Sequence, residues 1–295
     1  MDGLDTAMAQ HLRELGNGFN LPAVQALYAP LLQAQAREGV VPHADLRYGT
    51  HDRHRLDLYL PASPGPHPVL VWLHGGGFIR GDKQQCAHVG WWAARSGFAA
   101  VLPNYRLAPK CVWPSGPQDV VRLWTWLQTE GSAWGVDPQR VVLAGESAGA
   151  AHVAAAALMR PFQPPGWHIQ GAALLSGPYN ARLEGLAQRP FGIEHPDPRN
   201  TAYFGSDTSA WARASTVDHI DAAPFPLWLG YAERDLLQMQ VQAGELFARL
   251  VTQHGFRPEL HLVRDHNHFS ASLSLATADQ RLSASLLAFL RQTLG

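Results

Sequence analysis

A serine between two glycines, in residues 145–149 (Gly-Glu-Ser-Ala-Gly), is the segment best suited to covalent chemistry. Residues 140–144 read as a buried strand, and residues 150–158 are Ala-rich and helix-forming. In a G-x-S-x-G turn the serine sits in a strained link between strand and helix, and the glycines keep side chains out of the crowded space. Taken alone, the five residues also fit a plain glycine-rich turn. With these flanking elements, the sequence predicts Ser147 as a nucleophile.

A second glycine-rich segment lies upstream, where residues 74–78 (His-Gly-Gly-Gly-Phe) follow the apolar residues 69–73 directly. Glycines at the end of a strand let backbone N–H groups approach a ligand closely, which an oxyanion hole requires. The alternatives are an ordinary connection or a phosphate loop. Neither G-x-x-x-x-G-K-[ST] nor G-x-G-x-x-G occurs here, which argues against a phosphate loop.

Acid and base candidates follow two later strands. Glu233 and Asp235 come shortly after the apolar residues 226–230, and Glu233 can also form a surface salt bridge with Arg234. His266 and His268 lie just beyond the last expected strand. A nucleophilic serine needs a histidine that takes its proton and a carboxylate that orients that histidine.

A metal site is the competing interpretation of the histidine-rich end of the chain. The suitable ligand types are those of His261, Asp265, His266 and His268. No HExxH or comparable spacing is present, and we expect no metal and no cofactor. His261 falls within the expected strand, where packing is its simplest role.

The elements that must position these groups alternate between short apolar strands and helices, which is typical of a parallel sheet covered on both faces. The expected strands are 68–73, 99–103, 140–144, 171–175, 226–230 and 259–263, preceded by a hairpin of 46–48 and 56–60. The expected helices are 87–96, 118–130, 148–159, 237–254 and 276–294. The sequence thus predicts an α/β fold.

Two segments stand apart from this alternation. Residues 1–40 read as an N-terminal helical appendage, with a helix over 21–38 and Pro30 as a kink or boundary. Residues 177–223 are too long for an ordinary loop and are expected to form a cap or lid. Its aromatic residues, including Phe191 and Trp211, are expected to give the cap an apolar inner wall. Residues 1–295 are expected to form one domain.

Composition excludes several classes of function. The net charge is -1 and no Lys/Arg run is present, so we expect no nucleic-acid partner. No segment has the roughly 20 apolar residues that span a bilayer, and no membrane partner is expected. Cys86 and Cys111 are too few for a disulfide framework, which favours a cytoplasmic protein. The sequence leaves open whether the protein forms a homo-oligomer.

The two glycine motifs together resemble the α/β-hydrolase fold, specifically the hormone-sensitive-lipase-like esterases with an HGGG motif. Residues 104–109 (Asn-Tyr-Arg-Leu-Ala-Pro) and the following Trp113-Pro114 and Asp119 also look like that family. The resemblance runs from Leu46 to the C-terminus. It implies an oxyanion hole formed by the N–H groups of Gly76, Gly77 and Ala148.

The same resemblance implies a Ser-Asp-His order along the chain, with Asp235 as the acid and His268, before Phe269, as the base. It gives His74 a supporting role in the loop. Residues 80–83 and 266–269 resemble the aryl formamidase and BD-type esterase branch, although formamidases have HGGxW where this chain has His-Gly-Gly-Gly-Phe.

The implied activity is hydrolysis of small or medium acyl, or aryl, esters through an acyl-enzyme, so the expected partner is a small-molecule ester. An aryl formamidase-type amide hydrolase is the alternative. An acyltransferase is a second alternative, because acyltransferases of this fold share every one of these motifs. A non-catalytic binding module on this fold is a further alternative from another class.

Overall fold

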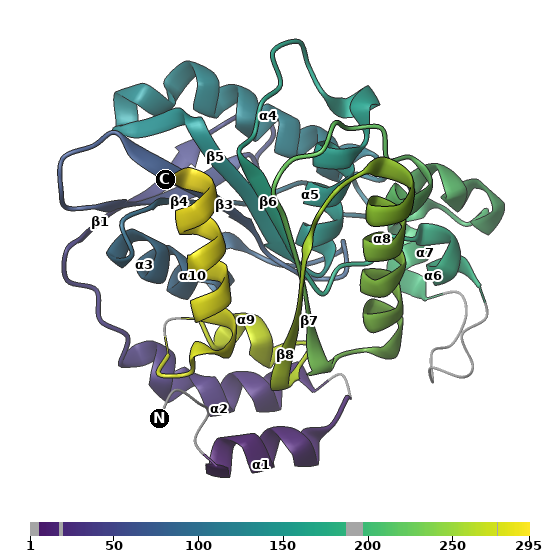
Figure 1. Ribbon diagram of the computed structural model, residues 1–295, viewed down its shortest axis with the longest axis horizontal. Coiled ribbons are helices and arrows are strands. Elements are labelled where there is room, and N and C mark those ends of the chain that lie inside the picture. Colours follow the sequence, from purple (N-terminus) through teal and green to yellow (C-terminus); the bar gives the residue numbers. More distant parts are fainter. Residues whose placement is uncertain (1–5, 18–19, 187–196, 276) are drawn as a thin grey trace.

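The computed structural model describes residues 6–17, 20–186, 197–275 and 277–295. An eight-stranded sheet forms its centre, in the order β1-β2-β4-β3-β5-β6-β7-β8 (Figure 1). The strands are β1 (Val40–Arg47), β2 (Arg55–Pro61), β3 (His67–Leu73), β4 (Ala99–Pro103), β5 (Val136–Glu146), β6 (Gly171–Leu175), β7 (Leu227–Arg234) and β8 (Glu259–Asn267). Antiparallel pairing joins β1 to β2 and β2 to β4, whereas β3 to β8 run parallel.

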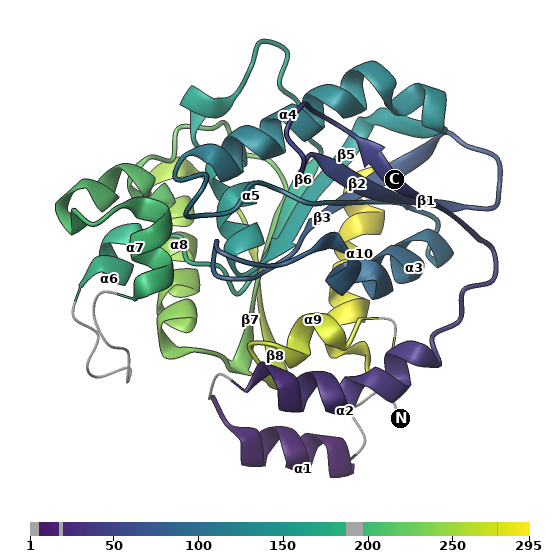
Figure 2. The ribbon, with the colours of Figure 1, turned by 180° about the vertical axis from the view of Figure 1, so that it is seen from behind.

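Helices cover both faces of this sheet. On one face lie α3 (Ala87–Arg95) and α10 (Gln280–Leu294), and on the other lie α4 (Ser115–Glu130), α5 (Ala148–Leu158) and α8 (Leu237–His254) (Figures 1 and 2). The central strands are buried from both sides, which is why they read as continuous apolar runs instead of alternating patterns. The predicted α/β architecture with a mostly parallel sheet is confirmed.

The main differences from the sequence prediction are at element ends. β5 begins at Val136, before the expected residue 140, because His67 pairs with Val136 in the neighbouring strand. β7 and β8 continue to Arg234 and Asn267, which pair with each other beyond the apolar residues. The C-terminal helix was expected from 276, which lies outside the described residues, and α10 begins at Gln280 after the N-cap Asp279.

Two N-terminal helices lie beside the end of β8 and the short helix α9 (Ser270–Leu273) in both views of the ribbon (Figures 1 and 2). They are α1 (Thr6–Leu15), which the sequence did not predict, and α2 (Leu21–Gln33), which ends before the expected residue 38. Pro30 lies inside α2 without ending it. Leu12, Val24 and Tyr28 are buried between these helices and pack against Phe269 and Leu273. No described helix is long and apolar enough to cross a membrane.

The stretch expected to form a cap is built from short helices. These are α6 (Ala181–Gly185), α7 (Pro198–Phe204) and two 3₁₀ helices, Thr208–Ala214 and Thr216–Asp218. Residues 187–196, including Phe191, lie outside the described part of the chain. Tyr203, Phe204 and Trp211 are buried and pack with Phe78 of the glycine loop, so the cap helices are joined to the end of β3.

Candidate active site

The candidate catalytic side chains follow the carboxyl ends of parallel strands. The glycine loop follows β3, Ser147 follows β5, Asp235 follows β7 and His268 follows β8. Carboxyl ends of parallel strands share one edge of a sheet, which is where ligands bind in open α/β folds. A cavity of about 280 Å³ opens there, and Ser147, His268 and the glycine loop all line it.

Ser147 occupies a strained turn, with φ of 51° and ψ of −122°. Gly149 allows this turn to pack under the sheet edge, because a Cβ atom on Gly149 would lie 2.3 Å from the carbonyl oxygen of Leu73. No real side chain tolerates such an approach to a backbone atom. The strand, turn and helix expected around Ser147 are therefore present, with a packing reason for the second glycine.

His268 bridges Ser147 and Asp235. Its Nε2 lies 3.1 Å from Ser147 Oγ and its Nδ1 lies 2.6 Å from Asp235 Oδ1. If Nδ1–H donates to the carboxylate, Nε2 is left as the acceptor facing the serine hydroxyl. Burial opposes the charged imidazole, but the Asp235 carboxylate outweighs it, so the pKa of His268 lies above its ordinary value. This arrangement can activate a hydroxyl nucleophile.

Asp235 is itself fixed by three donors and is fully buried. Ser176 Oγ donates to Oδ2, the N–H of Ala232 donates to Oδ2 at 3.1 Å, and the N–H of Leu236 donates to Oδ1 at 2.9 Å. Hydrogen bonds from these three donors hold the carboxylate in one orientation. The sequence alone did not identify Ser176. The feature that could have indicated it is its position directly after β6, at the same sheet edge as the other candidate residues.

Glu233, the other candidate for the acid, has partners away from His268. Glu233 accepts a hydrogen bond from the N–H of Asp265 at 2.6 Å and lies 3.6 Å from Arg234 Nη1. Its side chain is 38% exposed, and it does not line the cavity. The structure therefore brings Asp235, not Glu233, next to the histidine.

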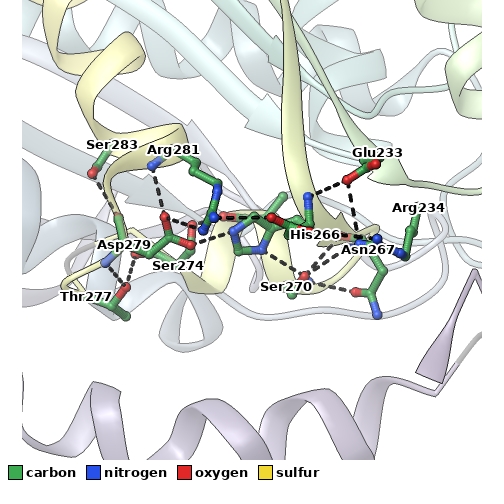
Figure 3. Close-up of polar contacts among 12 residues, drawn as sticks. Glu233, Arg234, His266, Asn267, Ser270, Ser274, Thr277, Asp279, Arg281 and Ser283 are labelled. Carbon is green, nitrogen blue, oxygen red and sulfur yellow. Dashed lines mark hydrogen bonds and ion pairs between the residues drawn. The ribbon is translucent and has the colours of Figure 1, made fainter. Parts of the chain in front are cut away.

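His266 lies in a separate buried network, shown in Figure 3. Its Nε2 is 2.7 Å from Asp279 Oδ2, and its Nδ1 is 3.0 Å from Ser270 Oγ. Ser270 Oγ also accepts a hydrogen bond from the N–H of Asn267 at 2.9 Å, so the network fixes the backbone of the residue before His268. His266 is fully buried and does not face Ser147. Sequence reasoning had not assigned Asp279 or Ser270 to the site.

The glycine loop presents its backbone to the cavity. Gly76 has φ of 135°, and a Cβ atom there would lie 2.0 Å from the carbonyl oxygen of Arg80. Within the described residues, no hydrogen bond from the N–H of Gly76 or Gly77 is found. Ala148 is the first residue of α5, where N–H groups lack intrahelical acceptors. All three residues line the cavity beside Ser147.

His74 lies beneath this loop, where it is 1% exposed. Its Nδ1 is 2.7 Å from the carbonyl oxygen of Gly75, and its ring stacks on Tyr105 at 4.3 Å. Burial lowers the pKa of His74 to about 4, so the imidazole is neutral near pH 7. It packs behind the loop and does not reach the cavity.

The cavity wall from the cap differs from the expected one. Among the described residues of the cap, those lining the cavity are Pro178, Glu184, Arg199 and Asn200. Trp211, expected on the inner wall, is 1% exposed and packs within the cap instead. The expectation of an aromatic wall was therefore wrong for Trp211, because the large rings are used to join the cap to Phe78. The N-terminal helix α2 contributes Leu21 and Gln25 to the wall.

The histidines considered as metal ligands have separate carboxylate partners. His261 Nε2 lies 2.9 Å from Glu259, whereas His266 and His268 contact Asp279 and Asp235. In the described parts of the chain, no group of three or more His, Cys, Asp or Glu side chains is arranged to hold a metal ion.

The chain belongs to the alpha/beta hydrolase fold family, whose model matches residues 70–271. It is 33% identical over 112 residues to the ethyl acetate hydrolase of Pseudomonas putida, a match that covers 36% of this chain and 35% of that protein. It is 28% identical over 240 residues to esterase LipQ of Mycobacterium tuberculosis (strain ATCC 25618 / H37Rv), covering 76% of this chain and 56% of LipQ.

Among solved structures, a bacterial heroin esterase superposes with a TM-score of 0.76 at 25% identity, covering 99% of this chain and 98% of that one. The matches to the two curated relatives span only about a third to just over half of those proteins' lengths. The family and the fold are thus established, and the relatives named here are ester hydrolases.

Proposed function

We propose that the protein is a carboxylic ester hydrolase, a serine carboxylesterase with Ser147 as nucleophile, His268 as general base and Asp235 as the orienting acid. The observation that carries this proposal is the placement of His268 between the other two side chains, 3.1 Å from Ser147 Oγ and 2.6 Å from Asp235 Oδ1. The esterase names of the relatives support it.

The proposed reaction is acyl transfer in two halves. His268 Nε2 takes the proton of Ser147 as Oγ attacks the ester carbonyl, and Asp235 stabilises the resulting imidazolium. The N–H groups of Gly76, Gly77 and Ala148 donate to the tetrahedral oxyanion. Collapse breaks the bond to the alcohol, which receives the proton from His268. Water attacks the acyl-enzyme in the same way, giving up its proton to His268, which returns it to Ser147 Oγ as the bond to the acid breaks.

Cavity size supports a small or medium acyl or aryl ester as substrate. A volume of about 280 Å³ lies just below the usual range of ligand pockets, roughly 300–1,000 Å³. Esters of short acids or single aromatic rings fit that volume.

We also propose a reducing compartment such as the cytoplasm. Both cysteines, Cys86 and Cys111, are free thiols, and Cys86 is buried in the core. Activity and stability that stay unchanged with a thiol reductant, together with fractionation of cells, test this.

The function is tested with Ser147→Ala and the matched control Ser63→Ala, which makes the same change in an exposed loop. We expect Ser147→Ala to lower kcat for p-nitrophenyl butyrate by at least about 10⁴-fold and to abolish labelling by a fluorophosphonate. Ser63→Ala should behave as wild type. Wild-type turnover by a folded Ser147→Ala enzyme contradicts the proposal.

A further inference from the structure

One wall of the cavity carries a buried carboxylate that the proposed reaction does not use. Glu184, in α6, lines the same cavity as Ser147 and is 7% exposed. Two neutral amides hold it: Gln242 Nε2 donates to Oε1 at 2.6 Å, and Asn200 Nδ2 donates to Oε2 at 2.8 Å. These donors fix the direction of the carboxyl group but bring no charge to it.

Within the described parts of the chain, the positively charged side chain near Glu184 is that of Arg199, which is already paired with Asp197. Arg199 lines the cavity and binds Asp197, with Nε 3.1 Å from both carboxylate oxygens. Among the described residues, no Lys, Arg or His forms an ion pair with Glu184. The Arg199–Asp197 pair is neutral overall, so among the described residues of this wall Glu184 adds one negative charge when it is ionised.

Burial of the Glu184 carboxyl group also favours binding of a cation. Burial raises the pKa of Glu184 to about 7, with a further increase from Asp197, while Gln242, Asn200 and Arg199 act in the opposite direction. A buried carboxylate without a cation is costly, and a cation that enters its site removes much of that cost. The carboxylate therefore has an unmet preference for a positively charged partner in the cavity.

Arg199 connects this wall to the reacting centre. A Cβ atom on Gly77 would lie 3.0 Å from Arg199 Cδ, so the side chain runs along the glycine loop. Its charge acts on both His268 and Glu184. A substrate arm that extends from Ser147 past Gly77 along this wall approaches Glu184.

We propose that Glu184 is a specificity-determining residue that binds a cationic group, such as an ammonium, on one arm of the ester substrate. This deepens the proposed ester hydrolysis and rests on it. The chemistry recognised is a positive charge linked to an ester by a short spacer, and Gln242 and Asn200 hold the receiving carboxylate in place.

The test compares esters that differ only in charge. Acetates of ω-trimethylammonio alcohols with spacers of increasing length are paired with carbon analogues that carry a tert-butyl group at the same position. A second series places the charge on the acyl arm. We expect kcat/KM for the cationic member to exceed that of its neutral partner by roughly tenfold or more at pH 8 for at least one spacer. A ratio near one at every length on both arms overturns the proposal.

The variant Glu184→Gln keeps the shape of the side chain and removes its charge. We expect it to bring the cationic-to-neutral ratio toward one. The matched control Glu245→Gln makes the same change on α8, outside the cavity lining, and should leave the ratio unchanged. If Glu184→Gln keeps the wild-type ratio, the cation does not bind at Glu184.

A second readout is the pH dependence of this ratio in the wild-type enzyme and in Glu184→Gln, because Glu146 also lines the cavity and burial raises its pKa. Because Glu184 gains its charge near pH 7, the ratio in the wild-type enzyme should rise between pH 6 and pH 8. The ionisation of His268 affects both esters equally and cancels in the ratio. A flat ratio across this range contradicts the proposal.

The two proposals fail differently. If the wild-type enzyme cleaves neutral p-nitrophenyl esters but shows no charge preference, the function stands and the role of Glu184 falls. If it cleaves no ester, the proposed function itself falls.

Discussion

Asp235 Oδ1 lies 2.6 Å from His268 Nδ1, and the two residues follow directly after Arg234 and Asn267, which are paired across β7 and β8. The strand register thus delivers the carboxylate and the imidazole to the same point of the sheet edge. Ser176, after the neighbouring strand β6, donates to the same carboxylate. Adjacent parallel strands therefore place the groups that we propose as acid and base.

The first prediction concerns pH. His268 must be neutral to accept a proton, and its pKa lies above the ordinary value of 6.5, so kcat/KM should rise with pH through a midpoint above 6.5. Asp235→Asn removes the charge that opposes the effect of burial. The remaining activity should be lower by about 10⁴-fold, with a midpoint at lower pH than wild type. A midpoint unmoved by this substitution would show that Asp235 does not set the pKa of the base.

The second prediction separates the two histidines. His268→Asn should lower kcat as severely as Ser147→Ala, whereas His266→Asn should lower it by about 10- to 100-fold, because the backbone beside His268 loses its anchor to Asp279 and shifts. Turnover is divided by the amount of folded enzyme, measured by gel filtration and circular dichroism, which corrects for misfolding. His261→Asn, the same change at a half-exposed position in β8, is the control and should match wild type. Loss equal to that of His268→Asn would instead make His266 the base.

The third prediction concerns the fold around the nucleophile. Gly149→Ala should destabilise the protein by more than about 3 kcal/mol, because the new Cβ meets the carbonyl oxygen of Leu73, which cannot move without breaking β3. Gly244→Ala, in α8, has open space around the Cβ position and should stabilise by up to about 1 kcal/mol. Urea unfolding curves measure both. Equal stability of the two variants would be inconsistent with the described packing.

The fourth prediction distinguishes esters from formamides. Cleavage of an amide requires that His268 protonate the leaving amine, whereas p-nitrophenolate leaves without a proton. We expect kcat/KM for p-nitrophenyl butyrate to exceed that for N-formylkynurenine by about 10²-fold. The opposite order would favour the formamidase alternative.

The sequence by itself determined the fold class and the strand, turn and helix around Ser147, which we propose as the nucleophile. Apolar strands and helices alternate visibly because both faces of the sheet are covered, and the glycines around Ser147 are required by backbone contacts within a few residues of chain or one neighbouring strand. The order of candidate groups along the chain also follows from their positions at strand ends. These features depend on contacts between residues that are close in the chain or in adjacent strands, so the sequence pattern alone predicts them.

Only the tertiary structure decided between neighbours of the same chemical type. Glu233 and Asp235 lie two residues apart, as do His266 and His268. Asp235 and His268 contact each other, whereas Glu233 accepts from the N–H of Asp265 and His266 contacts Asp279. Pairwise contacts such as Ser176 with Asp235 join residues far apart in the chain. The polar cavity wall at Glu184 could not be predicted for the same reason, because the aromatic side chains of Tyr203, Phe204 and Trp211 pack in one cluster with Phe78 and do not line the cavity.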